Sequence, residues 1–239
     1  MKFDKPLLEG TLIKRYKRFL ADVRLDDGSE ITVHCANSGA MTSCSEPGSR
    51  VIISDSQNPK RKLLHTLEMI RMGETWVGVN TNNPNKAVAE FVAAGRIPEL
   101  EGYDSLRREV KYGAEGRSRI DLLLEDDAEG GDGKAPCYVE IKNATMKVGE
   151  HSAFPDAVTE RGRKHLLDLL EVVRQGSRGV IFFFGGRDDC SRLRPADEVD
   201  PAYGETLRDV VAQGVEPLAY RMRFSPAGVE LLERMPVDL

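Results

Sequence analysis

The chain has 239 residues and a formal net charge of −5, which allows one large domain or two small ones and excludes a polycation of the histone kind. Its four cysteines are too scattered for a zinc site and are typical of reduced thiols. The start of the chain lacks an apolar signal segment and no run approaches the length of a membrane span, so we expect a soluble, cytoplasmic protein with no membrane contact.

Residues 8–80 favour short strands separated by polar turns. Turn chemistry is supplied by Asp26-Asp27-Gly28 and Asn37-Ser38-Gly39. Several short strands in about seventy residues are typical of a small β-barrel, of which the oligonucleotide-binding (OB) fold is the commonest design. The expected strands are 10–13, 19–25, 31–35, 50–54, 63–70 and 76–79.

Positive charge is concentrated in this N-terminal third. Residues 1–80 hold 12 Lys and Arg against 10 Asp and Glu (+2), which leaves 22 against 29 (−7) for the rest. Two basic clusters are candidates for nucleic-acid contacts, because cations neutralise phosphate and aromatic rings stack on bases. Solvated loops with ordinary solubility charge are an equally supported alternative. The candidate residues are Lys14, Arg15, Tyr16, Lys17, Arg18, Lys60, Arg61 and Lys62.

The pattern changes from strand to helix near residue 81. Asn83 is a credible N-cap, Pro84 suits the first helical position, and apolar residues follow at helical spacing. Glu90 lies at the edge of the apolar face and is either a third acid for a site on a neighbouring sheet or a surface glutamate. We therefore expect two domains, residues 1–81 and residues 82–239.

The apolar run 118–124 carries one acid. Successive strand side chains point to opposite faces, so Ile120, Leu122 and Leu124 are expected to share one face and to place Asp121 opposite them. A carboxylate in the middle of a strand is costly to bury unless it is paired or binds a metal.

The apolar run 137–143 carries a Glu-x-Lys motif. Val139 and Ile141 are expected on one face, and Glu140 and Lys142 on the other. A structural salt bridge would explain this motif by itself.

If the two strands are neighbours, Asp121, Glu140 and Lys142 converge on one surface. Two carboxylates can hold Mg²⁺ or Mn²⁺, and a lysine can then orient or deprotonate a water that attacks phosphorus. The sequence therefore indicates either an ion-pair cluster or a phosphodiester-hydrolysing site.

The remainder of the chain alternates helices and strands. The acidic, glycine-rich stretch 125–133 predicts a loop, and the apolar run 179–184 predicts a strand buried on both faces. The expected order after residue 81 is helix, three strands (107–112, 118–124 and 137–143), helix (to about residue 175), strand (179–184), helix (207–213) and strand (216–223). Basic residues open the second of these helices and either meet phosphate or form a solvated face: Arg161, Arg163, Lys164 and His165.

Several long strings of the chain resemble the sugar fermentation stimulation protein A (SfsA) family over essentially its whole length. They include Asn58-Pro59-Lys60-Arg61-Lys62, Tyr138-Val139-Glu140-Ile141-Lys142-Asn143 and Phe154-Pro155-Asp156-Ala157-Val158-Thr159. The resemblance implies an OB-fold-like barrel followed by an α/β restriction-endonuclease-like (PD-(D/E)XK) domain with a mixed central sheet. It also implies non-specific binding of DNA, with RNA as a further candidate partner.

On this resemblance Asp121 matches the metal-binding aspartate of the nuclease class, Glu140 and Lys142 match its Glu-x-Lys, and Glu90 matches a helix acid that some members use. Ile120 stands where the class name has proline. The first hypothesis is a Mg²⁺- or Mn²⁺-dependent DNA or RNA nuclease. In it Asp121, Glu140, the Ile141 carbonyl and Glu90 hold the metal, and Lys142 positions the attacking water.

The second hypothesis is a DNA-binding regulatory protein linked to sugar (maltose) metabolism, in which the nuclease fold is catalytically silent. Non-specific binding would then come from the basic clusters together with Arg163 and Lys164. The sequence shows no convincing helix-turn-helix segment, which disfavours direct reading of a promoter. The oligomeric state, with a homodimer as one candidate, is left open.

Overall fold

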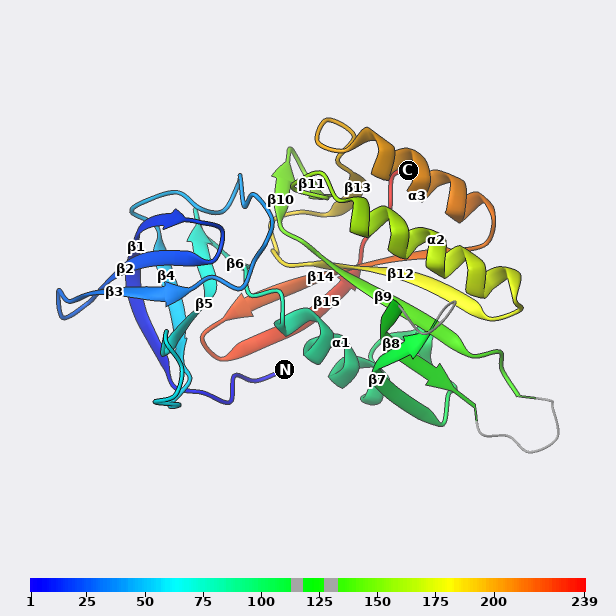
Figure 1. The fold of residues 1–239 in the computed structure, drawn as a ribbon, viewed down its shortest axis with the longest axis horizontal. Helices are drawn as coiled ribbons and strands as arrows, with labels where there is room; N and C mark the ends of the chain where they lie inside the picture. The colour runs from blue at the N-terminus through cyan, green and yellow to red at the C-terminus, as the bar shows by residue number, and fades with distance from the viewer. Residues whose placement is uncertain (113–117, 127–132) are drawn as a thin grey trace.

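The computed structural model describes residues 1–112, 118–126 and 133–239, and its N-terminal part is a closed six-stranded sheet (Figure 1). The strand order is β3-β2-β1-β4-β5-β6, and a pairing of His34 with Thr66 between β3 and β5 closes the barrel. The strands are β1 (Leu7–Tyr16), β2 (Leu20–Leu25), β3 (Glu30–His34), β4 (Arg50–Asp55), β5 (His65–Met72) and β6 (Thr75–Gly78). The predicted OB fold is confirmed.

Alternation along the strands fills the interior of the barrel. Leu12, Val23, Val33 and Val51 are fully buried and belong to one apolar cluster, while their chain neighbours are more exposed in β1 to β3. This period of two is the pattern from which the barrel was predicted.

The second part is built on a mixed six-stranded sheet of order β15-β14-β12-β9-β8-β7. β12 runs parallel to β9 and to β14, and the other neighbours are antiparallel. Its strands are β7 (Ser105–Tyr112), β8 (Ser118–Glu125), β9 (Cys137–Ala144), β12 (Arg178–Gly185), β14 (Glu216–Ser225) and β15 (Gly228–Arg234). The predicted mixed central sheet is therefore present.

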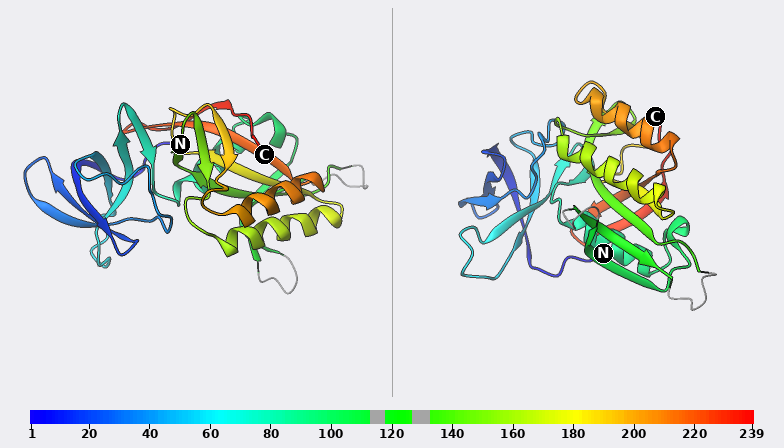
Figure 2. Two further views of the ribbon diagram at one scale, coloured as in Figure 1. Left: turned by 90° about the horizontal axis from the view of Figure 1, so that it is seen from above. Right: turned by 45° about the vertical axis from the view of Figure 1, so that its right-hand side comes forward.

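Helices cover both faces of this sheet (Figures 1 and 2). α1 (Asn83–Ala93) packs on one face, whereas α2 (Glu160–Arg174) and α3 (Pro201–Ala212) pack side by side on the other. The side chains of Phe182, Phe183 and Phe184 in β12 are buried alternately against the two layers. The prediction that this strand is central is confirmed.

The sequence missed several short elements. A small three-stranded sheet of order β10-β11-β13 lies between β9 and α3 in the chain, and a 3₁₀ turn, η1 (Pro98–Leu100), follows α1. The strands of this small sheet are β10 (Met146–Val148), β11 (His151–Phe154) and β13 (Arg192–Pro195). They are too short for the alternation of apolar and polar residues to be recognised in the sequence. None of the helices in the described part of the chain is long and apolar enough to cross a membrane.

The two parts are joined by more than the linker after β6. The chain start lies against the second part, where Met1 and Val229 exchange two backbone hydrogen bonds of 2.9 and 2.8 Å. Gly78 donates its backbone N–H to Gly186 at 2.8 Å, and Met41 donates to the carboxylate of Asp156 at 2.9 Å. The residues between β6 and α1 are therefore held from both sides.

Candidate functional site

The pairing of β8 with β9 stops at Asp121. The described ladder covers only Leu122 to Leu124, and beyond it the Asp121 Oδ2 atom accepts the backbone N–H of Ile141 at 2.7 Å. A carboxylate therefore takes the place of a backbone carbonyl between the two strands. The strands separate here because a side chain spans the gap, which opens the end of the sheet where the acids lie.

This irregularity corrects one prediction from the sequence. Leu122 and Leu124 pack towards α1 as a pair, but Ile120 packs on the opposite side with Leu123 and the α2 layer. Simple alternation would put Ile120 with Leu122. On the neighbouring strand Glu109 has φ of +55° beside Asp121, so both strands depart from regular geometry at this level.

Asp121, Glu140 and Lys142 form the cluster predicted from the sequence. Glu140 is its most deeply buried acid, at 3 % exposed. Its Oε1 atom accepts a hydrogen bond from Lys142 Nζ at 2.7 Å and a short one from His165 Nδ1 on α2. Its Oε2 atom is buried and has no hydrogen-bond partner among the described residues. A buried carboxylate oxygen without a partner is costly, which makes this atom a candidate ligand position.

The two carboxyl groups have opposite pKa shifts. Burial, followed by the charge of Glu140, raises the pKa of Asp121 to about 6. Burial alone would also raise the pKa of Glu140, but the adjacent Lys142 and His165 outweigh it and hold that pKa below its usual value. Asp121 therefore lacks a compensating cation of its own, and a metal ion would provide one.

The donor set fits a magnesium-like ion. Asp121, Glu140 and the predicted Ile141 carbonyl offer hard oxygen ligands, which Mg²⁺ and Mn²⁺ prefer. Within residues 1–112, 118–126 and 133–239, no group of three His, Cys, Asp or Glu side chains gathers around one point. Two carboxylates suffice for Mg²⁺, because this ion usually keeps several waters and takes further ligands from substrate phosphate.

Asn85 is the α1 side chain that reaches the cluster. Its Nδ2 atom donates to Asp121 Oδ1 at 2.6 Å. Glu90 lies on another side of the helix, since five residues correspond to a rotation of about 140°. Its carboxylate is 3.6 Å from the amino group of Met1. The structure thus places Glu90 at the chain start rather than among the hydrogen bonds of Asp121 and Glu140.

A cavity of ≈ 380 Å³ lies beside the cluster at the junction of the two parts. Ile141, Lys142 and Asn85 line it from the second part, and Arg18 and Asn37 line it from the barrel. Arg18 is the member of the first basic cluster that borders this space. The cavity therefore makes Lys142 accessible from outside the protein.

Three other members of the first basic cluster, Lys14, Arg15 and Tyr16, have local partners. The Arg15 guanidinium donates to the carbonyls of Asn37, Gly39 and Ala40 at 2.9 to 3.1 Å and so fixes the loop after β3. The Lys14 ammonium pairs with Asp22 at 3.5 Å, and the hydroxyl of Tyr16 donates to the same carboxylate. Lys17 is in the tight β1–β2 turn.

The remaining predicted contacts lie in two further places. Lys60 and Lys62 are exposed in the β4–β5 loop, where Arg61 donates to Thr66 at 3.3 Å. Arg163 and Lys164 are on α2, and the Lys164 ammonium donates to Asp168 and Ser118 at 2.6 Å. The predicted nucleic-acid contacts are thus divided among the end of β1 with the turn that follows it, the β4–β5 loop and α2.

Sequence analysis did not predict that His165 and Asn85 contact the two acids. The sequence left His165 as either a phosphate contact or part of a solvated basic face, but its ring bonds Glu140 and accepts a hydrogen bond from Arg161 Nε at 3.3 Å. The spacing of Arg161 and His165 at i and i+4 was a usable signal. Asn85 gave no signal beyond its place in the first turn of a helix.

Comparison with known proteins identifies the family. A family model described as "Sugar fermentation stimulation protein RE domain" matches residues 82–228, and one described as "SfsA N-terminal OB domain" matches residues 13–79. The chain belongs to the SfsA family. The resemblance seen in the sequence is thereby confirmed.

Relatives named "Sugar fermentation stimulation protein homolog" match along the full chain. The one from Geobacter metallireducens is 53 % identical over 239 residues and covers all of both chains. The one from Pelobacter propionicus is 54 % identical over 234 residues, 98 % of each chain. A solved structure, "The structure of Pyrococcus Furiosus SfsA in complex with Ca2+", superimposes with a TM-score of 0.88 at 25 % identity, covering 100 % of this chain and 98 % of that one.

Proposed function

We propose that this SfsA family member is a metal-dependent phosphodiesterase that cleaves DNA or RNA, and that it binds nucleic acid without sequence preference. One observation carries the proposal: the buried, unbonded Oε2 atom of Glu140 lies in a cluster with Asp121 and Lys142 at the edge of a cavity. A purely structural ion pair does not need a vacant carboxylate oxygen or an acid with a raised pKa.

Asp121, Glu140 and the Ile141 carbonyl would hold a divalent cation. When bound, this ion would neutralise charge on the phosphodiester and favour deprotonation of the attacking water. The Pyrococcus furiosus protein is described as a complex with Ca²⁺, which takes the same class of oxygen ligands. That similarity supports a cation site in the family.

The chain's own residues orient the reaction. Asn85 and the Ile141 N–H fix the two oxygens of Asp121, and His165 fixes one oxygen of Glu140. Lys142 donates to Glu140 and lines the cavity, so its ammonium group can position water and stabilise charge that develops on phosphate.

Binding of nucleic acid would use the barrel as well as the cavity. OB folds bind single-stranded nucleic acid through charged and aromatic side chains. Arg18 places one such cation in the cavity that contains Lys142. Affinity should therefore fall as salt concentration rises, because bound phosphates release counterions.

The test is degradation of labelled single- and double-stranded DNA and RNA in Mg²⁺, Mn²⁺ or EDTA. We expect cleavage that requires metal, is abolished in Glu140→Gln and falls by at least about 100-fold in Lys142→Ala. Lys147→Ala, which removes a lysine paired with Asp189 outside the cluster, is the matched control. Equal cleavage by parent and Glu140→Gln would overturn the assignment.

The second candidate function is a DNA-binding regulator of sugar metabolism with a silent nuclease fold. It is favoured by the family description, which names sugar fermentation. In that case the same assay would show binding in every condition without cleavage.

A further inference from the structure

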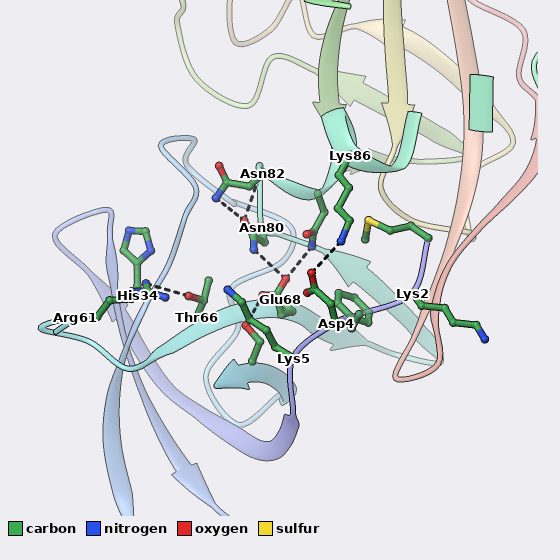
Figure 3. A pocket seen from close by; sticks show the side chains of 14 residues that line it. Lys2, Asp4, Lys5, His34, Arg61, Thr66, Glu68, Asn80, Asn82 and Lys86 are labelled. Atoms are coloured by element: carbon green, nitrogen blue, oxygen red, sulfur yellow. Dashed lines mark hydrogen bonds and ion pairs between the residues drawn. The ribbon is translucent and has the colours of Figure 1, made fainter. Parts of the chain in front are cut away.

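A second cavity, of ≈ 350 Å³, lies where the chain start crosses the barrel (Figure 3). The residues after β6 divide between the two cavities. Asn82, Asn83 and Lys86 line this one, whereas Pro84 and Asn85 line the cavity beside Lys142. The first turn of α1 therefore forms a wall between two distinct spaces.

The floor of the second cavity is fixed by Glu68 on β5, which is 5 % exposed. Its Oε1 atom accepts from the Ser54 hydroxyl at 2.6 Å, and its Oε2 atom accepts from the amides of Asn80 and Asn83 at 2.9 and 2.8 Å. Four side chains are thus locked together by neutral donors. A rigid polar floor is what a specific binding site requires.

Cations surround this floor. Lys86 pairs with Asp4 at 3.2 Å, but Lys5 and Arg61 form no ion pair with any residue that the structure describes. Figure 3 shows Lys5 and Lys86 reaching into the cavity, Arg61 beside Thr66 and His34, and Lys2 pointing away. Three cations of the lining, Lys5, Arg61 and Lys86, stand against two acids, Asp4 and Glu68, and this excess of positive charge in a chain of net charge −5 indicates an anionic ligand.

The start of α1 adds to this positive potential. Its N-cap, Asn82, makes no side-chain capping hydrogen bond, and its first turn contains no acidic residue. Free backbone N–H groups at a helix start attract anions. The helix start is a supporting feature here, because the cavity and its two unpaired cations already point to the same ligand class.

We propose that this cavity binds a phosphate group, held by Lys5, Arg61 and Lys86 over the floor formed by Glu68, Asn80 and Asn83. Arginine and lysine both suit phosphate, arginine through its planar pair of donors and lysine as a point charge. The phosphate belongs either to a free nucleotide or to a nucleic-acid strand. This site does not depend on the proposed phosphodiesterase activity.

The test is binding of inorganic phosphate to the full chain at low salt in EDTA, by calorimetry or phosphorus NMR. We expect saturable binding that weakens at least about tenfold in the Lys5→Ala/Arg61→Ala double variant. The matched control is Arg24→Ala/Arg71→Ala, which removes two positive charges from exposed ion pairs of the same barrel. We expect the control to bind phosphate as the parent does.

Competition separates the two sources of phosphate. Displacement by a mononucleotide but not by an oligonucleotide assigns the site to a free nucleotide, and displacement by an oligonucleotide assigns it to the strand. Absence of saturable phosphate binding, or equal loss in both double variants, would overturn the proposal. Because the assay contains EDTA and no turnover, its result is independent of whether the chain cleaves nucleic acid.

Discussion

Two buried glutamates of this chain face opposite situations. Glu68 in the barrel has both carboxylate oxygens bonded by a hydroxyl and two amides, and Glu140 in the mixed sheet keeps one oxygen without a partner among the described residues. Both are at most 5 % exposed. Burial is thus nearly the same, and the two acids differ in whether both carboxylate oxygens have hydrogen-bond partners.

The neighbouring charges strengthen this contrast. Lys142 and His165 both bond one oxygen of Glu140, and Asp121 is close enough for its pKa to be raised by the charge of Glu140. Several ionisable groups therefore lie around Glu140. Glu68 is bonded only by neutral groups, and the nearby cations remain available for a further ligand. We therefore interpret the first as a cation site and the cavity over the second as an anion site.

The largest expected effect on stability is at Glu68. Glu68→Ala leaves two buried donors, on Ser54 and Asn80, and one half-buried donor, on Asn83, without an acceptor, and should lower the free energy of unfolding by about 3–5 kcal/mol. Glu68→Gln keeps one oxygen that accepts from the two amides, and its own amide group can donate to the Ser54 hydroxyl, so it should cost about 1 kcal/mol. Urea unfolding measures both, and equal losses in the two variants would show that the carboxylate oxygens are not the stabilising feature.

At Glu140 the main effect should be on metal binding. Glu140→Gln should weaken Mn²⁺ binding by about 100-fold, since the substitution removes one anionic ligand. Glu68→Gln serves as the control, because it removes a buried charge outside the cluster. Calorimetric titration measures the Mn²⁺ affinity of both variants. Similar affinities would mean that Glu140 does not differ from Glu68 as a metal ligand.

Asp121→Asn should stabilise the protein, and it should also remove the proposed phosphodiesterase activity. The folded-state pKa of Asp121, about 6, is raised above its ordinary value of 3.8. Folding therefore favours the protonated form, and the parent loses stability as pH rises from about 4 to about 6. Above that range the Asn variant should be more stable by about 2 kcal/mol.

The measurement is the free energy of unfolding in EDTA at a series of pH values. The stability gap between Asp121→Asn and the parent should be small at pH 4 and should reach a plateau above about pH 6. A gap independent of pH would mean that the charge of Asp121 is not what destabilises the folded state.

The smallest expected effects concern basic residues of the barrel, which also differ in whether their side chains have bonding partners. Arg15 has its donors bonded to three loop carbonyls, whereas Lys17 and Arg18 make no side-chain ion pair or hydrogen bond with the described residues. Substituting Lys17 and Arg18 together by Asn should weaken single-stranded DNA binding at low salt by about threefold to tenfold. Asn tolerates the positive φ of 48° and 60° at these positions.

Arg15→Ala should instead lower the free energy of unfolding by about 1–3 kcal/mol, because the part-buried bonds to the carbonyls of Asn37 and Gly39 and the exposed bond to Ala40 lose their donor. Filter binding and urea unfolding, applied to both variants, separate the two roles. A larger loss of DNA affinity in Arg15→Ala than in the Lys17/Arg18 variant, with unchanged stability, would reverse the assignment.

Much of this molecule was determined locally by its sequence. Alternation in the barrel strands, the apolar run of β12 and the Glu-x-Lys motif each reflect the period of a strand, which depends on neighbours along the chain. The two-part fold and the pairing of Asp121 with Glu140 and Lys142 could therefore be predicted. The basic cluster at residues 14–18 was visible too, but its division into structural and free cations was not.

Tertiary structure decided the rest, because it depends on which distant groups approach one another. Only the break in the ladder at Asp121 moves Ile120 to the other face, and only the packing of α1 and α2 brings Asn85 and His165 to the acids. The cavity over Glu68 joins the chain start, β4, β5 and the linker after β6. No local pattern encodes such a meeting, since burial and hydrogen-bond satisfaction are properties of the folded chain.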